Sequence, residues 1–243
     1  EMTGEDKVKF ANLEEGAPFI VDASGAGSHI SRRIGVKTFD LTTLSADVPC
    51  DSATLSRYQE LAVIDLAAGG WGYSWIFPKQ GYLSIGAGAP RGVNLRQMLQ
   101  GMLLQEGLSP ASSLKGYRLP IILPGSPLRY NNILVTGDAA GLADPLIGAG
   151  ISWGMLSGKL AAQAIIEGKA ELYPQLINME IFSQLKVASK VLSLITLLFR
   201  LRLLPNSRRL TSLMISVPDG SLSYSQLARR RGLIYFMLRQ KVK

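Results

Sequence analysis

The stretch from Ile133 to Ile165 constrains the fold of this chain more than any other. It begins with a short apolar run, "ILV", whose composition favours a buried parallel strand. Asp138 follows at the tip of that strand, and a glycine pair, Gly148 and Gly150, precedes a run of small apolar residues. A strand, a turn and a helix in this order predict an α/β unit, which binds ligands beyond the carboxyl end of its strand.

The residues at this strand tip suit a flat ligand that carries hydroxyl groups. Asp138 can accept hydrogen bonds from the hydroxyls of a ribose-like or ribityl chain. The helix after Gly148 offers unpaired N–H groups and a partial positive charge at its start, and glycine lets its backbone approach a flat ring closely. Pro145 stiffens the turn. Because the helix is small and apolar on nearly every face, we expect it to be buried against the sheet. An ordinary strand–turn–helix without a ligand is the competing interpretation.

The rest of the chain places a sheet between two pieces of this unit. A strand within "APFIVDASG" is followed by a helix with Ser28 as its N-cap. Three strand-like runs come next, and the last two are separated only by residues 79–81, which predicts a hairpin. A helix capped by Asn94, an extended segment broken by Pro120 and Pro124, and C-terminal helices complete the order.

This order predicts an α/β (α+β) fold in which a mixed or antiparallel sheet is inserted into a nucleotide-binding domain. We expect residues 1–37 and 129–169 to form the nucleotide-binding domain. Residues 38–128 would form the inserted β-sheet domain, and residues 170–243 a basic helical region. The sequence contains no internal repeat or low-complexity tract that would suggest another plan.

Charge is unevenly distributed along the chain. The formal net charge is +8, but residues 181–243 alone contain twelve basic residues and one acidic residue. Such asymmetry favours an anionic surface as a partner of the C-terminal region. The basic residues do not alternate with stacking aromatic residues, so a membrane surface is favoured and nucleic acid is not expected as a partner.

The longest apolar run, Val191 to Phe199, is far shorter than the roughly 20 residues that span a bilayer. Lys186 and Lys190 precede it and Arg200 and Arg202 follow it. This pattern is typical of a helix that lies on a membrane surface, but a core helix with basic ends has the same pattern. We recognise no secretory signal in the first residues, and we expect a cytoplasmic protein that associates peripherally with membranes if this helix binds lipid.

Sites built from cysteine or histidine are not expected. Cys50 and His29 are the single residues of their types. One cysteine excludes an intrachain disulfide, and the two residues together argue against a zinc site or a Ser-His-Asp triad. We therefore predict no metal site.

Three patches resemble the FAD-dependent reductases and hydroxylases with the p-hydroxybenzoate hydroxylase fold, and among these the geranylgeranyl reductase family. "GDAAGLADPLIGAGISWGMLSGKLAAQAI" is similar to the second flavin-binding motif of that fold. "VDASGAGSHISRRIG" resembles its Asp-Gly fingerprint, but Ser24 holds the usual aspartate position and Asp22 lies two residues earlier. "GYSWIFPKQGYLSIGAG" resembles the substrate-cavity signature of the family. In this third patch, the matching residues are Tyr73, Trp75, Phe77, Pro78, Ile85 and Gly86.

The resemblance implies an FAD-dependent oxidoreductase that reduces prenyl double bonds of a lipid or pigment precursor, with NAD(P)H or another reductant as electron donor. Asp138 would bind the ribityl chain, and residues 148–151 would lie under the pyrimidine edge of the isoalloxazine ring. Tyr73, Trp75, Phe77 and Pro78 would contact the hydrophobic prenyl chain. The cofactor-binding residues that the resemblance implies are Gly137, Asp138, Pro145, Gly148, Ala149, Gly150, Ile151 and Asp22.

Two parts of a complete enzyme are not assigned. We identify no catalytic residue, although Cys50 and Tyr73 are candidates for the proton donor. The family's pyrophosphate-binding Gly-x-Gly-x-x-Gly is missing, because the nearest pattern, Gly86 to Gly92, follows a hairpin strand and is interpreted as a strand-to-helix turn. The chain therefore resembles the last two-thirds of a flavoprotein, with its first βαβ unit truncated or supplied elsewhere. We predict that residues 1–243 alone bind little flavin.

Two alternatives stay open at this point. One is a flavin-dependent monooxygenase or halogenase of the same fold, which an uncoupled burst of hydrogen peroxide with an aromatic substrate would favour. The other is a non-catalytic, membrane-associated fragment that lacks its nucleotide-binding half. The genomic sequence upstream of Glu1 would distinguish this fragment from the enzyme.

Overall fold

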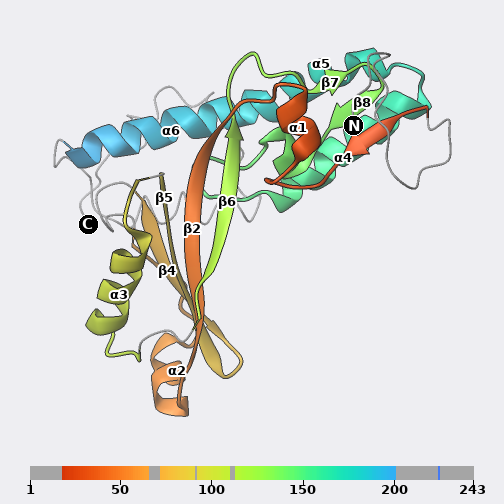
Figure 1. Cartoon of the computed structure of the whole chain (residues 1–243). Helices are drawn as coiled ribbons and strands as arrows, with labels where there is room; N and C mark the ends of the chain where they lie inside the picture. Colours follow the sequence, from red (N-terminus) through yellow and green to blue (C-terminus); the bar gives the residue numbers. More distant parts are fainter. Residues whose placement is uncertain (1–17, 66–71, 91, 110–112, 201–223, 225–243) are drawn as a thin grey trace, which may run out of the picture. The chain divides into compact units, whose positions relative to one another are not determined.

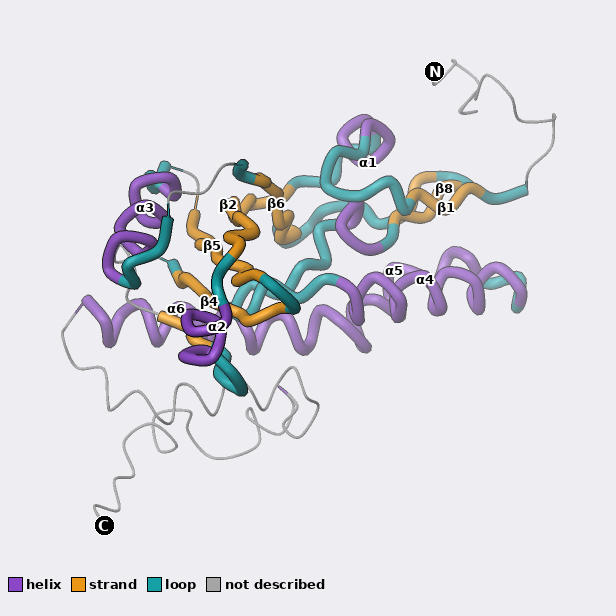
Figure 2. The backbone as a smooth tube through the Cα atoms, turned by 90° about the horizontal axis from the view of Figure 1, so that it is seen from below, coloured by secondary structure: helices purple, strands orange, loops and turns teal. Residues whose placement is uncertain are grey.

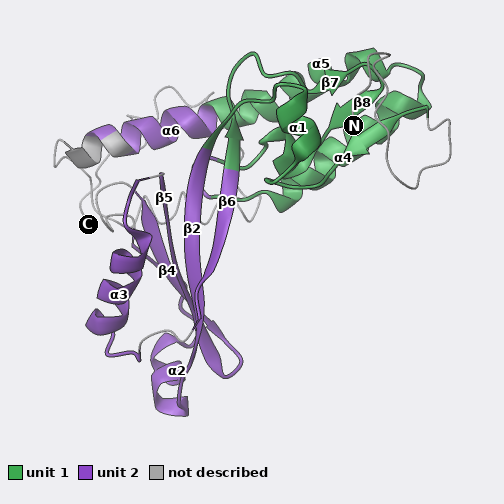
Figure 3. Ribbon diagram, in the orientation of Figure 1, with its two compact units in different colours: residues 1–39, 120–144, 148–186 green, residues 40–119, 145–147, 187–243 purple. Residues whose placement is uncertain are grey.

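The structure is a computed structural model of the chain, drawn in Figure 1 and Figure 2. It divides the chain into two compact units, coloured separately in Figure 3. The α/β unit comprises residues 1–39, 120–144 and 148–186, and the sheet unit comprises residues 40–119, 145–147 and 187–243. The residues that the structure describes are 18–65, 72–90, 92–109, 113–200 and 224.

The α/β unit is built on a three-stranded sheet in the order β1–β8–β7. β1 (Ile20–Asp22) pairs in parallel with β8 (Ile133–Val135), and the two strands lie side by side in Figure 2. β7 (Arg129–Tyr130) pairs with β8 in antiparallel orientation. All three side chains of β8 are buried, so the predicted buried parallel strand is confirmed.

Helices complete the α/β unit. Ser28 caps the first helix by accepting a hydrogen bond from the Ser31 N–H at 3.0 Å, which confirms the predicted N-cap. Residues 170–182 form three short helical segments, which lead into a longer helix that begins at Ser183. The helical segments are α1 (His29–Arg33), η2 (Gly137–Ala140), α4 (Ile151–Ile166), η3 (Ala170–Leu172), α5 (Tyr173–Ile177) and the π-helical η4 (Asn178–Phe182). The helix α6 (Ser183–Arg200) begins in this unit, and its residues from Val187 onward belong to the sheet unit.

The helix α4 packs one face against the sheet. Leu160 and Ala161 lie in the hydrophobic core of the unit together with residues of β8. Ile151, Met155 and Ile166 are exposed at 82%, 74% and 84%. The predicted burial of α4 against the sheet is therefore confirmed for one face, and residues on the opposite side are exposed.

The sheet unit contains a five-stranded sheet in the order β3–β4–β5–β2–β6. β4 and β5 pair in antiparallel orientation around a turn at Gly81, so the predicted hairpin is confirmed. β5 also pairs antiparallel with β2, and β3 with β4. The strands are β2 (Thr38–Pro49), β3 (Val63–Asp65), β4 (Tyr73–Lys79), β5 (Tyr82–Pro90) and β6 (Lys115–Ile122).

Two parts of this sheet differ from the sequence-based expectation. The sequence does not predict β2, because only Leu41, Ala46 and Val48 of its twelve residues are buried and no apolar run marks it. Gly86 to Pro90 continue β5, so the expected strand-to-helix turn is wrong for these residues. Pairing with β4 on one side and with β2 on the other keeps this glycine-rich segment extended.

Two helices pack in the sheet unit, α2 (Ser52–Tyr58) and α3 (Leu95–Gln105). The Asn94 side chain accepts a hydrogen bond from the Gln97 N–H at 3.1 Å, which confirms the predicted cap of α3. Leu99 of α3 is buried with Ile85 of β5 in the largest hydrophobic cluster of this unit. Figure 1 shows α3 running beside β4 and β5.

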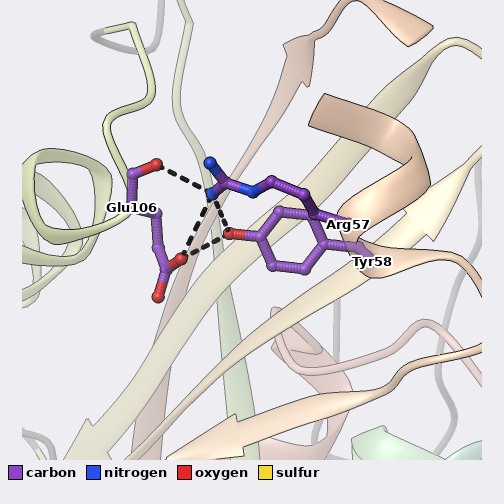
Figure 4. Close-up of polar contacts among 3 residues, drawn as sticks. All are labelled: Arg57, Tyr58 and Glu106. Carbon is purple, nitrogen blue, oxygen red and sulfur yellow. Dashed lines mark hydrogen bonds and ion pairs between the residues drawn. The ribbon is translucent and has the colours of Figure 1, made fainter. Parts of the chain in front are cut away.

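Three polar side chains join the ends of α2 and α3 (Figure 4). The Tyr58 hydroxyl donates to Oε2 of Glu106 at 2.5 Å, and Nη2 of Arg57 donates to the Glu106 carbonyl oxygen at 3.2 Å. Arg57 also forms an ion pair with the Glu106 carboxylate at 3.7 Å, but both side chains are substantially exposed, so this pair adds little stability. The cluster fixes one helix against the other.

The start of α6 is covered by protein. There, Leu185, Ala188 and Val191 are buried, and Lys186 and Lys190 are exposed. Further along the apolar run, Leu197 is 51% exposed, so the core helix and the membrane-bound helix both stay predictions. Among the described residues, no helix combines the length and the hydropathy needed to cross a bilayer. The C-terminal helices predicted beyond residue 200 lie outside the described residues.

Candidate functional site at the end of β8

The ends of β1 and β8 are tied together in the α/β unit. The Thr136 N–H donates to the Asp22 carbonyl oxygen at 2.9 Å, and the Thr136 hydroxyl donates to the same oxygen at 3.1 Å. The buried Tyr173 hydroxyl donates to the Val135 carbonyl oxygen at 2.7 Å. These bonds fix the point at which the chain leaves β8, and therefore the position of the turn that follows.

That turn, η2, is held close to α4. Gly137 has a φ of 54°, a left-handed conformation that favours glycine. Its N–H donates to Oγ of Ser157 in α4 at 2.9 Å. A Cβ on Gly137 would lie 3.4 Å from Cα of Gly154, so the backbone of the turn lies close to the helix. A glycine at this position satisfies both the φ angle and the close approach.

Asp138 is the one carboxylate of this turn, and it is half-buried. Burial raises the pKa of Asp138 above its ordinary value. No donor to its carboxylate is recorded among the described residues, and burial is the single cause of the pKa shift. A carboxylate that has lost part of its water without gaining donors retains its capacity to accept hydrogen bonds. Its environment therefore favours a ligand that supplies hydroxyl or N–H donors.

A second turn leads into α4. The Asp144 N–H donates to the Ala149 carbonyl oxygen at 2.8 Å, and the Gly148 N–H donates to the Asp144 carbonyl oxygen at 2.9 Å. Gly148 has a φ of 69°, which again favours glycine. Pro145 is buried in this segment. The turn is closed by its own backbone and delivers the chain to the first residue of α4.

The first turn of α4 lacks a side-chain cap. Gly150 is the N-cap and has no side chain that could accept from the first N–H groups of the helix. A helix of 16 residues also carries a partial positive charge at this end. A Cβ on Gly150 would lie 2.9 Å from Oδ1 of Asp138. The structure therefore brings together the two predicted features, the carboxylate of Asp138 and the start of α4.

This arrangement can bind two kinds of group side by side. The Asp138 carboxylate accepts hydrogen bonds, and the N–H groups at the start of α4 donate them. A helix end stabilises negative charge by about 0.3–2 kcal/mol. The site therefore suits a ligand with hydroxyl groups next to an electron-rich polar edge, and the glycine at position 150 leaves room for a flat group.

Asp22, the second predicted acidic contact, has a different environment. It is 3% exposed, and its carboxylate accepts hydrogen bonds from the Ser24 N–H at 3.1 Å and from three serine hydroxyls. These hydroxyls belong to Ser24, Ser28 and Ser31, at 2.6, 2.5 and 2.9 Å. Burial would raise the pKa of Asp22, but the serine hydrogen bonds outweigh it and hold the pKa below its ordinary value. The carboxylate orders its own loop, and its contact with a cofactor stays a prediction.

The predicted substrate-binding aromatic residues lie on β4 in the sheet unit. Tyr73 and Trp75 have ring centroids 5.6 Å apart, and Trp75 and Phe77 are stacked at 6.3 Å. All three are half-buried. Gly86 pairs with Trp75 across the hairpin, and a side chain at Gly86 would overlap the indole. The strand therefore presents a continuous aromatic surface, and the register partners of Trp75 and Tyr73 on β5 are glycines, Gly86 and Gly88.

Pro78 does not share this surface. Successive residues of a strand point to opposite faces, so Pro78 lies on the face of Ile76. Its register partner is Leu83, a fully buried core residue. The structure thus brings Tyr73, Trp75 and Phe77 together and leaves Pro78 on the other side of the sheet.

The two candidates for a proton donor are not activated in an obvious way. The Cys50 thiol donates to the Val48 carbonyl oxygen at 3.1 Å, and burial raises its pKa. It lies beside the core of the sheet unit. Tyr73 is part of the aromatic surface. Among the described residues, no group of three or more metal-ligating side chains occurs.

Sequence patterns do not identify three residues that support the site: Thr136, Ser157 and Tyr173. Thr136 and Ser157 stand in an apolar strand–turn–helix sequence and give no motif of their own. Ser157 is one of several polar residues in α4, so its polarity alone does not single it out. Tyr173 is far from the site in sequence, and only the tertiary fold brings its hydroxyl to β8.

Comparison with known proteins identifies reductases of isoprenoid compounds. The chain is 27% identical over 186 residues to the digeranylgeranylglycerophospholipid reductase of Thermoplasma volcanium, covering 65% of this chain and 43% of that protein. It is 28% identical over 203 residues to the menaquinone reductase of Mycobacterium tuberculosis, covering 75% of this chain and 50% of that protein. The chain therefore spans half or less of the length of these relatives. No protein-family profile matches it.

Solved structures support the same fold. A geranylgeranyl bacteriochlorophyll reductase-like protein from Thermoplasma acidophilum superposes with a TM-score of 0.58 at 22% identity, covering 72% of this chain and 50% of that protein. The flavin-dependent brominase Bmp2 superposes with a TM-score of 0.56 at 17% identity, covering 84% of this chain and 55% of that protein. The mixed α/β architecture with its five-stranded and three-stranded sheets thus matches FAD-dependent oxidoreductase folds.

Sequence similarity to the reductases extends over about 60–75% of the chain, and the fold agrees with it. The chain is a distant homologue of the geranylgeranyl and digeranylgeranylglycerophospholipid reductases.

Proposed function

We propose that the chain is part of an FAD-dependent oxidoreductase that reduces prenyl double bonds of a lipid or pigment precursor. The observation that supports the proposal is the position of the Asp138 carboxylate next to Gly150 at the start of α4. This carboxylate is half-buried, and no donor to it is found in the described part of the chain. The names of the relatives support the substrate class, since they include reductases of a digeranylgeranyl lipid and of menaquinone.

The residues at the end of β8 fit FAD. Asp138 would accept hydrogen bonds from ribityl hydroxyls, which would supply the donors that its carboxylate lacks. The N–H groups that follow Gly150 would hold the pyrimidine edge of the isoalloxazine ring, and Ile151, exposed at 82%, would contact the ring. Gly137 and Gly148 hold the two turns in left-handed conformations. Ala149 and Pro145 belong to the second turn, which sets where α4 begins.

When bound, FAD supplies the hydride-transfer chemistry that no side chain can provide. The chain orients the cofactor and adjusts its electrostatic environment. A change of 1.4 kcal/mol in the relative stability of two redox states corresponds to about 30 mV for a two-electron couple. A helix end worth about 0.3–2 kcal/mol can therefore shift the potential by tens of millivolts but cannot set it alone.

The aromatic surface of β4 is the proposed contact for the prenyl chain. Tyr73, Trp75 and Phe77 offer stacked rings that are half-buried and so remain accessible on one side. Burying one CH₂ group contributes about 0.8 kcal/mol, so a five-carbon unit contributes up to about 4 kcal/mol. Apolar contact with these rings therefore provides a large part of the affinity, and residues 38–128 would be the substrate domain.

The electron donor in this proposal is NAD(P)H or another reductant, and the protein is cytoplasmic. Peripheral binding to an anionic membrane would involve the basic residues beyond α6. At the start of α6, Leu185, Ala188 and Val191 are buried and so do not face a membrane, whereas Leu197 is 51% exposed.

An assay with the full-length translation product that contains this chain tests the function. The protein is supplied with FAD, a reductant and a geranylgeranyl lipid, and the product is analysed by mass spectrometry. Each reduced double bond gains one hydride and one proton, so the mass rises by two hydrogen atoms per bond. The variant Trp75→Ala should raise KM more than it lowers kcat, and Trp75→Phe should restore most of the loss. Leu104→Ala, an exposed apolar position on α3, is the control.

The fold also occurs in a flavin-dependent brominase, so the assay includes the other chemistry. The proposal fails if an aromatic substrate elicits a burst of hydrogen peroxide or a halogenated product while the prenyl lipid keeps its mass. A full-length protein that binds no flavin and reduces no lipid would favour a non-catalytic fragment.

A further inference from the structure

The face of the five-stranded sheet that carries the aromatic residues of β4 also carries hydroxyl groups. Directly opposite residues on paired strands share a face of the sheet, so the register decides which side chains lie together. The strand β5 separates β4 from β2, which places β2 about 10 Å from the aromatic strand. Across β4, β5 and β2, the three rows on this face are Tyr73 with Gly88 and Thr43, Trp75 with Gly86 and Ser45, and Phe77 with Ser84 and Asp47.

The rings of β4 reach across β5 because glycines lie opposite them. A Cβ on Gly86 would lie 2.1, 2.4 and 2.6 Å from three atoms of the Trp75 indole. A Cβ on Gly88 would lie 3.5 Å from Cε1 of Tyr73 and 3.2 Å from Cγ2 of Thr43. The aromatic side chains of β4 and the side chains of β2 therefore meet over the glycines and form one continuous surface.

The hydroxyl cluster of this surface consists of Thr43, Ser45 and Ser84, all half-buried. Among the described residues, none of these three hydroxyls forms a hydrogen bond within the protein. The hydroxyl of Thr42, on the opposite face of β2, differs because it donates to the Ala89 carbonyl oxygen at 3.3 Å. Hydroxyls that have lost part of their water without gaining a partner favour a ligand that supplies oxygen acceptors.

The charge on this face disfavours an anionic ligand. Asp47 belongs to the third row and is exposed. Its Oδ2 accepts a hydrogen bond from Nζ of Lys115 on β6 at 3.0 Å, so this cation already has a partner. The three rows themselves contain no basic residue. A phosphate beside them would be repelled by the Asp47 carboxylate, whereas a neutral carbonyl or hydroxyl oxygen would not.

We propose that this face binds a prenyl chain attached to a flat, neutral ring that carries oxygen atoms, as in a prenylated quinone, in preference to a prenyl phosphate. The ring stacks on Trp75, and its oxygen atoms accept hydrogen bonds from Ser45 and its neighbours in the hydroxyl cluster. The prenyl chain extends over the remaining rings of β4. This inference rests on the proposed function, because it takes the aromatic surface as the contact for a prenyl chain, and it narrows the substrate class.

Equilibrium binding to the full-length translation product that contains this chain tests the inference. The two probes are a naphthoquinone with a geranylgeranyl chain and geranylgeranyl diphosphate, both in the same detergent. Free ligand is separated by ultrafiltration and quantified by mass spectrometry. Ser45→Ala removes one hydroxyl of the cluster, and Ser45→Thr keeps it. Thr42→Val, on the other face of the same strand, is the matched control. Circular dichroism verifies the fold, and Thr43→Val replaces Ser45→Ala if that variant does not fold.

We expect the parent protein to bind the quinone at least tenfold more tightly than the diphosphate. Ser45→Ala should weaken quinone binding about fivefold, the effect of one neutral hydrogen bond, and leave diphosphate binding unchanged. Ser45→Thr and Thr42→Val should bind the quinone like the parent. Asp47→Asn should strengthen diphosphate binding alone, because it removes the like charge and releases Lys115.

Three results would overturn the inference. Diphosphate binding as tight as quinone binding would mean that the face does not select a neutral ring. Quinone binding that Ser45→Ala leaves unchanged would exclude the hydroxyl cluster from recognition. Binding of neither probe would also remove the aromatic surface as the contact for a prenyl chain. The first two results leave the proposed reduction intact if the protein with FAD adds hydrogen to a prenyl lipid. Quinone binding as expected, without reduction of any prenyl compound, would instead reject the proposed function alone.

Discussion

At the scale of single residues, Asp22 and Asp138 differ in what their charges contact. Asp22 is almost fully buried and accepts hydrogen bonds from Ser24, Ser28 and Ser31. Asp138 is half-buried, and no donor to it is recorded in the described part of the chain. Hydrogen bonds stabilise the ionised form and burial disfavours it, so the two pKa values move in opposite directions. Substitutions at the two positions should therefore have opposite effects on stability.

Replacing Asp138 with asparagine should stabilise the flavin-free protein and weaken flavin binding. A raised pKa in the folded state means that the ionised carboxylate opposes folding at neutral pH. The stabilisation should be complete above the folded-state pKa and disappear as pH falls toward the ordinary value of 3.8. Hydrogen bonds to a charged acceptor contribute about 1.5–3 kcal/mol, so the flavin Kd should rise by about tenfold or more. Urea unfolding between pH 7 and pH 3 and flavin titration of the full-length protein measure the two effects.

The control for Asp138→Asn is Asp47→Asn, which removes an exposed ion pair with Lys115. It should change stability by less than about 1 kcal/mol and leave flavin binding unaltered. An Asp138→Asn variant that binds flavin as tightly as the parent would contradict the proposed role of this carboxylate.

Replacing Asp22 with asparagine should destabilise the protein by about 1.5–3 kcal/mol at pH 7, because the serine donors lose a charged acceptor. The pKa of Asp22 is lowered in the folded state, so its contribution is present above the unfolded value of 3.8 and is lost as pH falls through the folded value. The difference between parent and variant should therefore shrink in acid. Ser24→Ala, which removes one hydroxyl donor, should show a smaller effect of the same kind. A difference that is constant from pH 7 to pH 2 would argue against this account.

At the scale of helices and strands, the sequence predicts caps and turns well, because both groups of each interaction lie close together in the sequence. The caps Ser28 and Asn94 and the hairpin around Gly81 follow from short-range chemistry, and the structure has all three. β2 and the extended form of Gly86 depend on neighbouring strands, and the sequence alone does not give them. The same holds for the site: its turns carry recognisable glycines, but the bond from Ser157 that places Gly137 is a tertiary contact.

Replacing Gly150 with alanine should lower flavin affinity without unfolding the protein. The new Cβ would lie 2.9 Å from Oδ1 of Asp138, so the carboxylate must move. The φ of Gly150 is −122°, which alanine adopts readily, so the backbone itself is not strained. Gly101→Ala in α3 is the matched control, because nothing lies within 4 Å of its Cβ. It should stabilise its helix by about 0.5–1 kcal/mol and leave flavin binding unchanged.

Thermal unfolding and flavin fluorescence measure both glycine variants. The account is contradicted if Gly150→Ala and Gly101→Ala bind flavin equally well, or if Gly150→Ala loses affinity only because it has unfolded.

At the scale of the whole chain, the pairing of β1 with β8 joins two segments that the five-stranded sheet separates in sequence. An insertion of this kind is predictable, because a parallel pair requires a crossover connection. The exposure of Met155 and Ile166 is not predictable from composition, since it depends on what covers α4. The site at the end of β8 lies in the same unit as this parallel pair. We predict that residues 1–243 alone bind little flavin, because the pyrophosphate-binding Gly-x-Gly-x-x-Gly that the resemblance implies is missing from them.

Hydrogen exchange on the full-length protein, with and without FAD, tests the central claim most directly. The claim is that the turn with Asp138 and the start of α4 contact the same ligand. We predict that FAD slows exchange at least tenfold in peptides covering residues 137–140 and 148–153, and leaves peptides covering α2 unchanged. Protection of one of the two segments without the other, or of neither while FAD is bound, would contradict the account.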